Sequence, residues 1–114
     1  MFLWVDDVRE PPSDEWLWAR SVVEARTAIR FYERQMSDDT ILIDLDHDAG
    51  DYAQDGGDYI EILNWLEREG IVDMGYFFRF HSQNPVGVEN MRRIIEHNGW
   101  REVGGKINLA TIFN

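Results

Sequence analysis

The chain has 114 residues, of which 44% are hydrophobic, and a formal net charge of −11 from 22 acidic and 11 basic residues. This length and apolar content indicate one folded domain over residues 1–114 and exclude a disordered chain, while the negative charge disfavours general DNA or RNA binding because it repels a phosphate backbone. The absence of cysteine excludes disulfides, a thiol nucleophile and cysteine-based zinc sites.

The first residues, MFLWVDDVRE, turn acidic after a short apolar start. They do not resemble a signal peptide, and no apolar run approaches the roughly 20 residues of a membrane span. We therefore expect a cytoplasmic protein that has no membrane partner.

Hydrophobic periodicity and turn residues predict alternating strands and helices. In chain order we expect strands at 2–5 and 15–20, a helix at 22–36, a strand at 41–45, a loop at 48–57, a helix at 59–69, a strand at 76–80, a helix at 85–97 and a short strand at 101–103, followed by a C-terminal tail without a predicted element. This order predicts an α/β sandwich in which right-handed crossovers bring the strands at 2–5, 41–45 and 76–80 side by side. The loop at 48–57, rich in Gly and Asp, is expected to be mobile and to cover the polar ends of these strands.

Each predicted helix begins with a capping signal. Ser21 and Glu24 form a capping box, and Asp58 with Glu61 repeats the same spacing. Asn84 is expected to cap the third helix, because a proline follows it at the first helical position.

Carboxylates follow two of the predicted strands at their carboxyl ends. Asp6 and Asp7 follow the first strand, and Asp46 follows the strand at 41–45. Because open α/β sheets bind ligands at this edge, we expect the three carboxylates to share one pocket, where their oxygens suit Mg²⁺ or Mn²⁺. Asp6 or Asp7 could instead cap a turn after the strand. Asp44, inside the strand, is predicted to be a buried hydrogen-bonding acid.

Two of the three histidines also fall at the predicted strand ends. His47 follows the acids of the strand at 41–45, and His81 follows the strand at 76–80. Beside carboxylates, two imidazoles can serve as acid and base near neutral pH, although a structural role for each is the alternative. His97 lies near a helix end and is expected to interact with the helix dipole.

Residues that could bind a phosphate lie at the same edge. Ser82, Asn84 and the first amides of the following helix form a candidate anion site. Arg9 could add a bidentate contact to phosphate, or pair with a neighbouring acid. Asp48 is also predicted to contact the phosphate of the substrate.

Four segments together resemble the cyclic-phosphate-processing receiver-like family, often called cREC, which is related to the receiver domains of two-component signalling. They are LWVDDVR at 3–9, WLWARSVVEA at 16–25, LDHDAG at 45–50 and HSQNPVG at 81–87. The resemblance extends to about Val103. It implies a receiver-like, flavodoxin-like three-layer sandwich with a mainly parallel sheet of four or five strands.

The resemblance also implies roles for individual residues. Asp46 matches the phosphoacceptor of a receiver, Asp6 and Asp7 match its metal-binding acids, and Ser82 matches its serine or threonine. Lys106, the only lysine, lies near the predicted last strand. The chain departs from an ordinary receiver at three positions: His47, Asp48 and His81.

The leading hypothesis is a phosphoesterase that processes a cyclic phosphate on a small nucleotide or an RNA end. Mg²⁺ or Mn²⁺ would bind Asp6, Asp7 and Asp46, with His81 as acid or base and His47 as its partner or orienting group. A metal-free mechanism that uses the two histidines is the mechanistic rival.

Two further hypotheses come from other classes of protein. The first is a true or degenerate receiver that switches a protein partner after phosphorylation at Asp46. The second is an acidic, non-enzymatic inhibitor that imitates nucleic acid by its charge. The sequence leaves the oligomeric state open.

Overall fold

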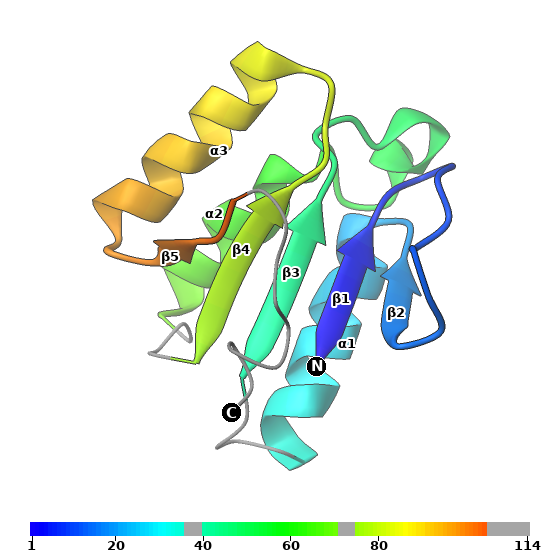
Figure 1. Cartoon of the computed structure of the whole chain (residues 1–114), viewed down its shortest axis with the longest axis horizontal. Coiled ribbons are helices and arrows are strands. Elements are labelled where there is room, and N and C mark those ends of the chain that lie inside the picture. Colours follow the sequence, from blue (N-terminus) through cyan, green and yellow to red (C-terminus); the bar gives the residue numbers. More distant parts are fainter. Residues whose placement is uncertain (36–39, 71–74, 105–114) are drawn as a thin grey trace.

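The computed structural model describes residues 1–35, 40–70 and 75–104 (Figure 1). Its elements in chain order are β1 (Phe2–Val5), β2 (Trp16–Ala19), α1 (Val22–Gln35), β3 (Ile41–Leu45), the 3₁₀ helix η1 (Gly50–Gln54), α2 (Ile60–Glu69), β4 (Tyr76–Phe80), α3 (Pro85–His97) and β5 (Arg101–Glu102). These elements match the predicted order. The end of the first predicted helix, near Met36, and Lys106 lie outside the described residues.

The five strands form one parallel sheet in the order β2-β1-β3-β4-β5. The strands predicted to be neighbours, β1, β3 and β4, are adjacent in this sheet. Their register sets Trp4 beside Asp44, and Asp44 beside Arg79. The predicted receiver-like α/β class is therefore confirmed.

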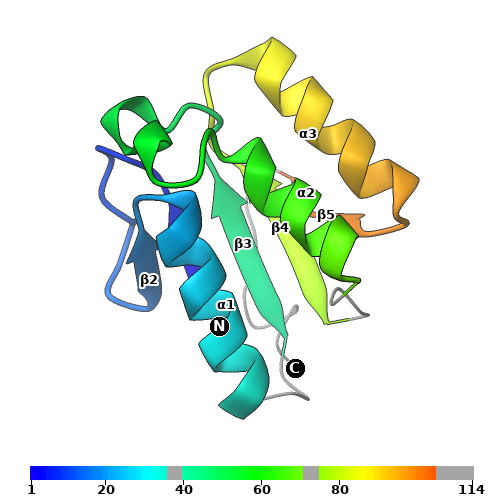
Figure 2. The same cartoon turned by 180° about the vertical axis from the view of Figure 1, so that it is seen from behind.

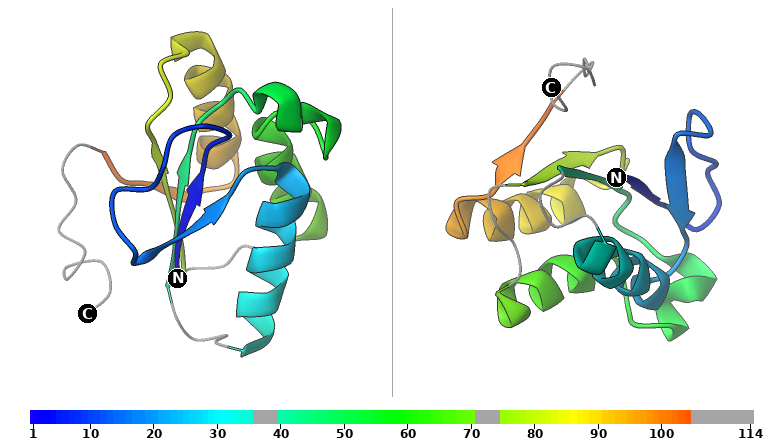
Figure 3. Two further views of the ribbon diagram at one scale, coloured as in Figure 1. Left: turned by 90° about the vertical axis from the view of Figure 1, so that its right-hand side faces the viewer. Right: turned by 90° about the horizontal axis from the view of Figure 1, so that it is seen from below.

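All three α-helices lie on one face of the sheet (Figures 2 and 3). The link from β1 to β2, residues 6–15, contains no helix, and the other crossovers all step in the same direction across the sheet. Since parallel crossovers are right-handed, they place their helices on the same face. The described part of the chain thus has two layers, and the three-layer arrangement predicted from the resemblance is wrong for it.

The main core lies between this helical layer and the sheet. Its fully buried members include Ile43 from β3, Trp65 from α2 and Met91 from α3. A smaller buried cluster, Trp4 with Trp16 and Leu42, lies on the other face of the sheet. The central strands β1 and β3 are buried on both faces, as is usual in parallel sheets, whereas β2 and β5 have exposed residues.

Local capping agrees with the sequence for two helices. The Ser21 hydroxyl accepts from the Glu24 N–H at 3.0 Å, and the Asn84 side chain accepts from the Gly87 N–H at 3.0 Å. The prediction for Asp58 is wrong, because α2 begins at Ile60 without a side-chain cap. The Asp58 carboxylate instead accepts from the Ala49 N–H at 3.0 Å.

The segment predicted as a mobile loop, 48–57, contains the helix η1 and packs on the rest of the fold. Ala49 is buried, and Ser21 donates to the Asp55 carboxylate at 2.6 Å. Among the helices that the structure describes, none has the length and apolar character needed to cross a membrane.

Candidate functional site

Three carboxylates gather at the carboxyl ends of β1 and β3. Asp6, Asp7 and Asp46 each offer an oxygen atom, and these oxygens all lie within 4.8 Å of one another. They meet because β1 and β3 are parallel neighbours whose last paired residues, Val5 and Leu45, stand side by side. The sequence predicted this trio, which we call the acid cluster.

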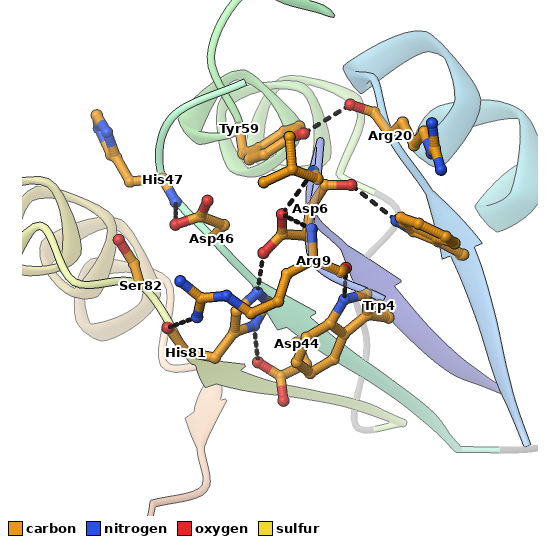
Figure 4. Close-up of polar contacts among 12 residues, drawn as sticks. Trp4, Asp6, Arg9, Arg20, Asp44, Asp46, His47, Tyr59, His81 and Ser82 are labelled. Atoms are coloured by element: carbon orange, nitrogen blue, oxygen red, sulfur yellow. Dashed lines mark hydrogen bonds and ion pairs between the residues drawn. The ribbon is translucent and has the colours of Figure 1, made fainter. Parts of the chain in front are cut away.

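Asp6 is the buried member of the acid cluster (Figure 4). Its Oδ1 accepts from the N–H groups of Val8 and Arg9 at 2.9 and 2.8 Å, and its Oδ2 faces His81 Nε2 at 2.8 Å. Burial alone would raise the pKa of Asp6, but the hydrogen bonds from Arg9, Val8 and His81 outweigh it and lower the pKa. Asp6 therefore caps the turn after β1 and also belongs to the cluster.

Asp7 has the opposite electrostatic environment. Burial raises its pKa, and the negative charges of Asp6 and Asp46 raise it further. The ionised form of Asp7 is thus disfavoured in the folded protein, as like charges packed without a cation require.

Replacing Asp7 with asparagine is expected to raise the melting temperature of the metal-free protein at neutral pH by a few degrees. A carboxyl group whose pKa is raised in the folded protein stabilises the fold at pH values below its ordinary pKa of 3.8. This contribution to stability is lost as the pH rises through the raised pKa. The increase in melting temperature of Asp7→Asn should therefore vanish at acidic pH. Circular dichroism melts with EDTA at both pH values measure it, with the exposed Asp14→Asn as control. A lower melting temperature for Asp7→Asn at neutral pH would contradict the prediction.

His81 lies between two buried carboxylates (Figure 4). Its Nε2 is 2.8 Å from Asp6 Oδ2 and its Nδ1 is 2.7 Å from Asp44 Oδ1. Each ring nitrogen therefore lies at hydrogen-bonding distance from a carboxylate oxygen, and an ionised carboxylate can only accept a hydrogen bond. The ring also stacks on Trp4, with centroids 3.8 Å apart and planes at 6°. This geometry favours a positioning and charge-balancing role for His81.

The buried charges continue across the sheet to Arg79. Its Nε pairs with Asp44 Oδ2, so Asp44 accepts from both Arg79 and His81. Basic and acidic side chains alternate in this network, from Arg79 through Asp44 and His81 to Asp6. Each buried carboxylate thereby has a partner, as burial of charge requires.

His47 does not approach His81. Its ring points away from Asp46 (Figure 4), and its Nδ1 lies 2.8 Å from Asp48 Oδ1. The ring packs so closely on the start of α3 that a methyl group added at Gly87 would overlap it. The predicted pair of histidines therefore does not share one pocket.

The candidate phosphate-binding residues differ in what they can still bind. Arg9 is exposed, and its Nη1 donates to the His81 carbonyl at 3.3 Å, which holds the guanidinium near Asp6 (Figure 4). The Ser82 hydroxyl accepts from the Asn84 N–H at 3.1 Å. Asn84 uses its carbonyl oxygen for the helix cap, and its Nδ2 lies 3.3 Å from His47 Nδ1. Arg9 is the cation best placed to meet an anion.

Two residues of the site were not identified from the sequence. Tyr59 is fully buried, and its hydroxyl donates to the Arg20 carbonyl at 2.6 Å. Burial and the charges of Asp7, Asp6 and Asp46 raise the pKa of Tyr59, so it stays neutral. Gly50 has a φ of +56° and lies against the Asp7 carboxylate. Its place in LDHDAG, four residues after Asp46, was a signal that a side chain is excluded there.

The substitution Gly50→Ala is expected to displace Asp7 and to weaken Mg²⁺ binding by about tenfold or more, the effect of disturbing an outer-shell contact. A methyl group at this position would overlap Asp7 Oδ2. Gly70→Ala is the matched control, because Gly70 has a φ of +63° but nothing within 4 Å of an added methyl. Both variants should lose about 1–2 kcal/mol of stability from the left-handed backbone. Calorimetric titration that finds equal metal affinity in the two variants would refute this role of Gly50.

The donor set fits a hard divalent cation. Asp7 and Asp46 are partly exposed, so they are reachable from solvent, and their oxygens lie close enough to share one ion. Oxygen ligands of this type are those that Mg²⁺ and Mn²⁺ prefer. Binding of a metal to the cluster stays a prediction.

Comparison with known proteins places this chain in a family. The family model described as "Cyclic-phosphate processing Receiver domain" matches residues 1–97, a span that includes every residue of the acid cluster. No curated protein and no solved structure matches the chain. Since the family model covers most of the sequence, the chain belongs to the cyclic-phosphate processing receiver domain family.

Proposed function

We propose that the protein is a metal-dependent phosphoesterase that opens or removes a cyclic phosphate on a nucleotide or an RNA end. The observation that supports this most is the acid cluster, whose three carboxylate oxygens lie within 4.8 Å at the carboxyl edge of a parallel sheet. This edge is where open α/β sheets bind ligands. The family's description links such domains to the processing of cyclic phosphates.

Mg²⁺ or Mn²⁺ would be held by Asp7 and Asp46, with Asp6 as the third ligand. The repulsion that raises the pKa of Asp7 is the kind that a cation relieves. When bound, such a cation stabilises the charge that develops on the phosphoryl oxygens and lowers the pKa of a coordinated water.

The neighbouring residues orient the acid cluster and the substrate. Arg9 binds a phosphate oxygen from its exposed position beside Asp6. His81 holds the Asp6 carboxylate with Nε2, so in this proposal it positions a ligand rather than transferring a proton. His47 Nδ1 donates to Asp48 Oδ1, and the Asp48 carboxylate, whose Oδ2 lies 3.5 Å from Asn84 Nδ2, orients Asn84 at the start of α3.

The experiment combines metal titration with turnover. Isothermal titration of the purified protein with MgCl₂ and MnCl₂ should give a saturable heat, and 2′,3′-cyclic AMP should be hydrolysed only when one of these ions is present. EDTA should stop the reaction, and excess Mg²⁺ should restore it. Hydrolysis that continues in EDTA would reject the metal-dependent mechanism, and no hydrolysis of any cyclic nucleotide or cyclic-phosphate RNA end would reject the phosphoesterase.

A receiver that signals by phosphorylation is the second candidate. Asp46 follows the central strand β3 and lies beside two further acids, which is the arrangement that a phosphoacceptor needs. Beryllofluoride with Mg²⁺ would then shift backbone amide signals around Asp46 and Ser82. Hydrolysis of a cyclic phosphate without such shifts would decide against this candidate.

A further inference from the structure

A groove of about 690 Å³ lies between β2 and α1, away from the acid cluster. Five large apolar side chains are exposed in residues 1–35, 40–70 and 75–104, and three of them line this groove: Leu17, Val23 and Phe31. Phe31 is 66% exposed and Leu17 is 50% exposed. Such a concentration of exposed apolar groups on one small domain marks an interaction surface.

The strand β2 lies at an edge of the sheet beside α1 (Figure 2), and residues of both elements line the groove. In the described chain β2 is one of the two outer strands, with β5 at the other edge, and it pairs only with β1. Asp6 N–H donates to the Ala19 carbonyl, so the polar groups of Ala19 face β1. By the alternation of a strand, the backbone N–H and C=O of Trp18 face outward. An added strand would find hydrogen-bonding groups at the edge and apolar side chains beside them.

The charge around the groove indicates what kind of chain would fit. Glu15 and Glu24 line the groove, and the whole chain has a net charge of −11. A symmetric pair of β2 strands from two copies would bring these acidic side chains together, because an isologous interface uses the same patch twice. Lysine or arginine on a partner would instead be attracted.

We propose that the β2–α1 groove binds an extended segment of another protein that carries alternating apolar and basic residues. The segment adds to the open edge of β2, as in β-strand addition, and its apolar side chains enter the groove beside Leu17, Val23 and Phe31. Its basic side chains lie near Glu15 and Glu24. This binding is independent of the acid cluster and of the proposed hydrolysis.

The test uses fluorescence anisotropy of a labelled peptide in which valine alternates with lysine. Two control peptides separate the contributions: one has serine for every valine, and the other has glutamate for every lysine. The full chain is compared with Phe31→Ser, which removes an exposed ring from the groove, and with Val86→Ser, which removes an equally exposed apolar side chain on α3. Both positions are exposed, so neither variant should unfold.

We expect the valine–lysine peptide to bind the wild type and Val86→Ser equally and Phe31→Ser at least tenfold more weakly, with both control peptides weaker on the wild type. Equal binding to Phe31→Ser and the wild type would overturn the proposal, and so would equal binding of the serine peptide, which would indicate charge attraction alone. Sedimentation velocity compares the oligomeric state of the wild type with that of Phe31→Ser. A wild-type dimer that Phe31→Ser abolishes, together with no peptide binding, would identify a second copy as the occupant and would also overturn it.

Discussion

The variant Asp46→Asn is expected to lose the metal-dependent hydrolysis of a cyclic phosphate by about a hundredfold or more in kcat/KM. Asparagine keeps the shape of the side chain but removes an anionic oxygen from the acid cluster. Asp6 is already engaged by two backbone N–H groups and His81, so Asp7 would be the one partly exposed carboxylate left in the acid cluster. Disturbing even outer-shell partners of a metal costs about 10- to 100-fold, and loss of a direct ligand should cost at least as much.

Asp46→Asn should leave the fold intact. Among the described residues, the Asp46 side chain accepts a hydrogen bond from the His47 N–H at 2.9 Å, and an amide oxygen can accept it equally well. Asp51→Asn is the matched control, because it makes the same chemical change on an exposed acid of η1. Titration calorimetry and turnover of 2′,3′-cyclic AMP are measured for both variants.

The pattern of losses distinguishes the two candidate functions. A phosphoesterase loses both the heat of Mg²⁺ binding and turnover in Asp46→Asn, and neither in Asp51→Asn. A receiver would show no turnover in the wild type, and Asp46→Asn would lose the amide shifts caused by beryllofluoride. Full hydrolytic activity in Asp46→Asn would rule out the acid cluster as the catalytic site.

Convergence of the acid cluster could be predicted because it depends on one rule of topology. Asp6, Asp7 and Asp46 directly follow two apolar strands, and the carboxyl ends of adjacent parallel strands meet at one edge of the sheet. The caps at Ser21 and Asn84 could be predicted for a similar reason, since each depends on residues within one turn.

The direction of the two histidine side chains could not be read from composition at the strand ends. His81 enters the buried network because Trp4, Asp44 and Arg79, from three different strands, share one level of the sheet. That register depends on the whole fold. For His47 a local argument existed, since neighbouring residues in an extended chain point to opposite sides and Asp46 points into the cluster.

The number of layers in the fold depends on the link between β1 and β2, which contains no helix. Residues 6–15 join two adjacent parallel strands without a helix, so no crossover covers the second face of the sheet in the described residues. The prolines at 11 and 12 correctly predicted a loop in this link. The resemblance, however, implied three layers, and a link without a helix leaves the second face of the sheet without its helical layer in the described residues.

The variant His81→Ala is expected to lower the free energy of unfolding by about 3–5 kcal/mol, the cost of removing one partner from a buried ion pair. Asp6 is 1% exposed and Asp44 is fully buried, so the loss of the imidazole leaves Asp6 with its two backbone N–H donors and Asp44 with Arg79. Such a loss is a large part of the roughly 5–15 kcal/mol that stabilises a small domain. Urea unfolding at neutral pH, followed by tryptophan fluorescence, measures it.

Two further variants separate the buried charge network from a general loss of packing. His97→Ala removes an exposed histidine from the end of α3 and should change the stability by no more than about 0.5 kcal/mol. The double variant Asp6→Asn with His81→Ala should be more stable than His81→Ala alone, because the uncompensated carboxylate is gone while Oδ1 can still accept from Val8 and Arg9. A loss below about 1 kcal/mol for His81→Ala, the usual range of an exposed ion pair, or a double variant that is less stable still, would show that His81 is not the counterion of Asp6 and Asp44. In that case the ring would again be available for the proton transfer that its position in the sequence suggested.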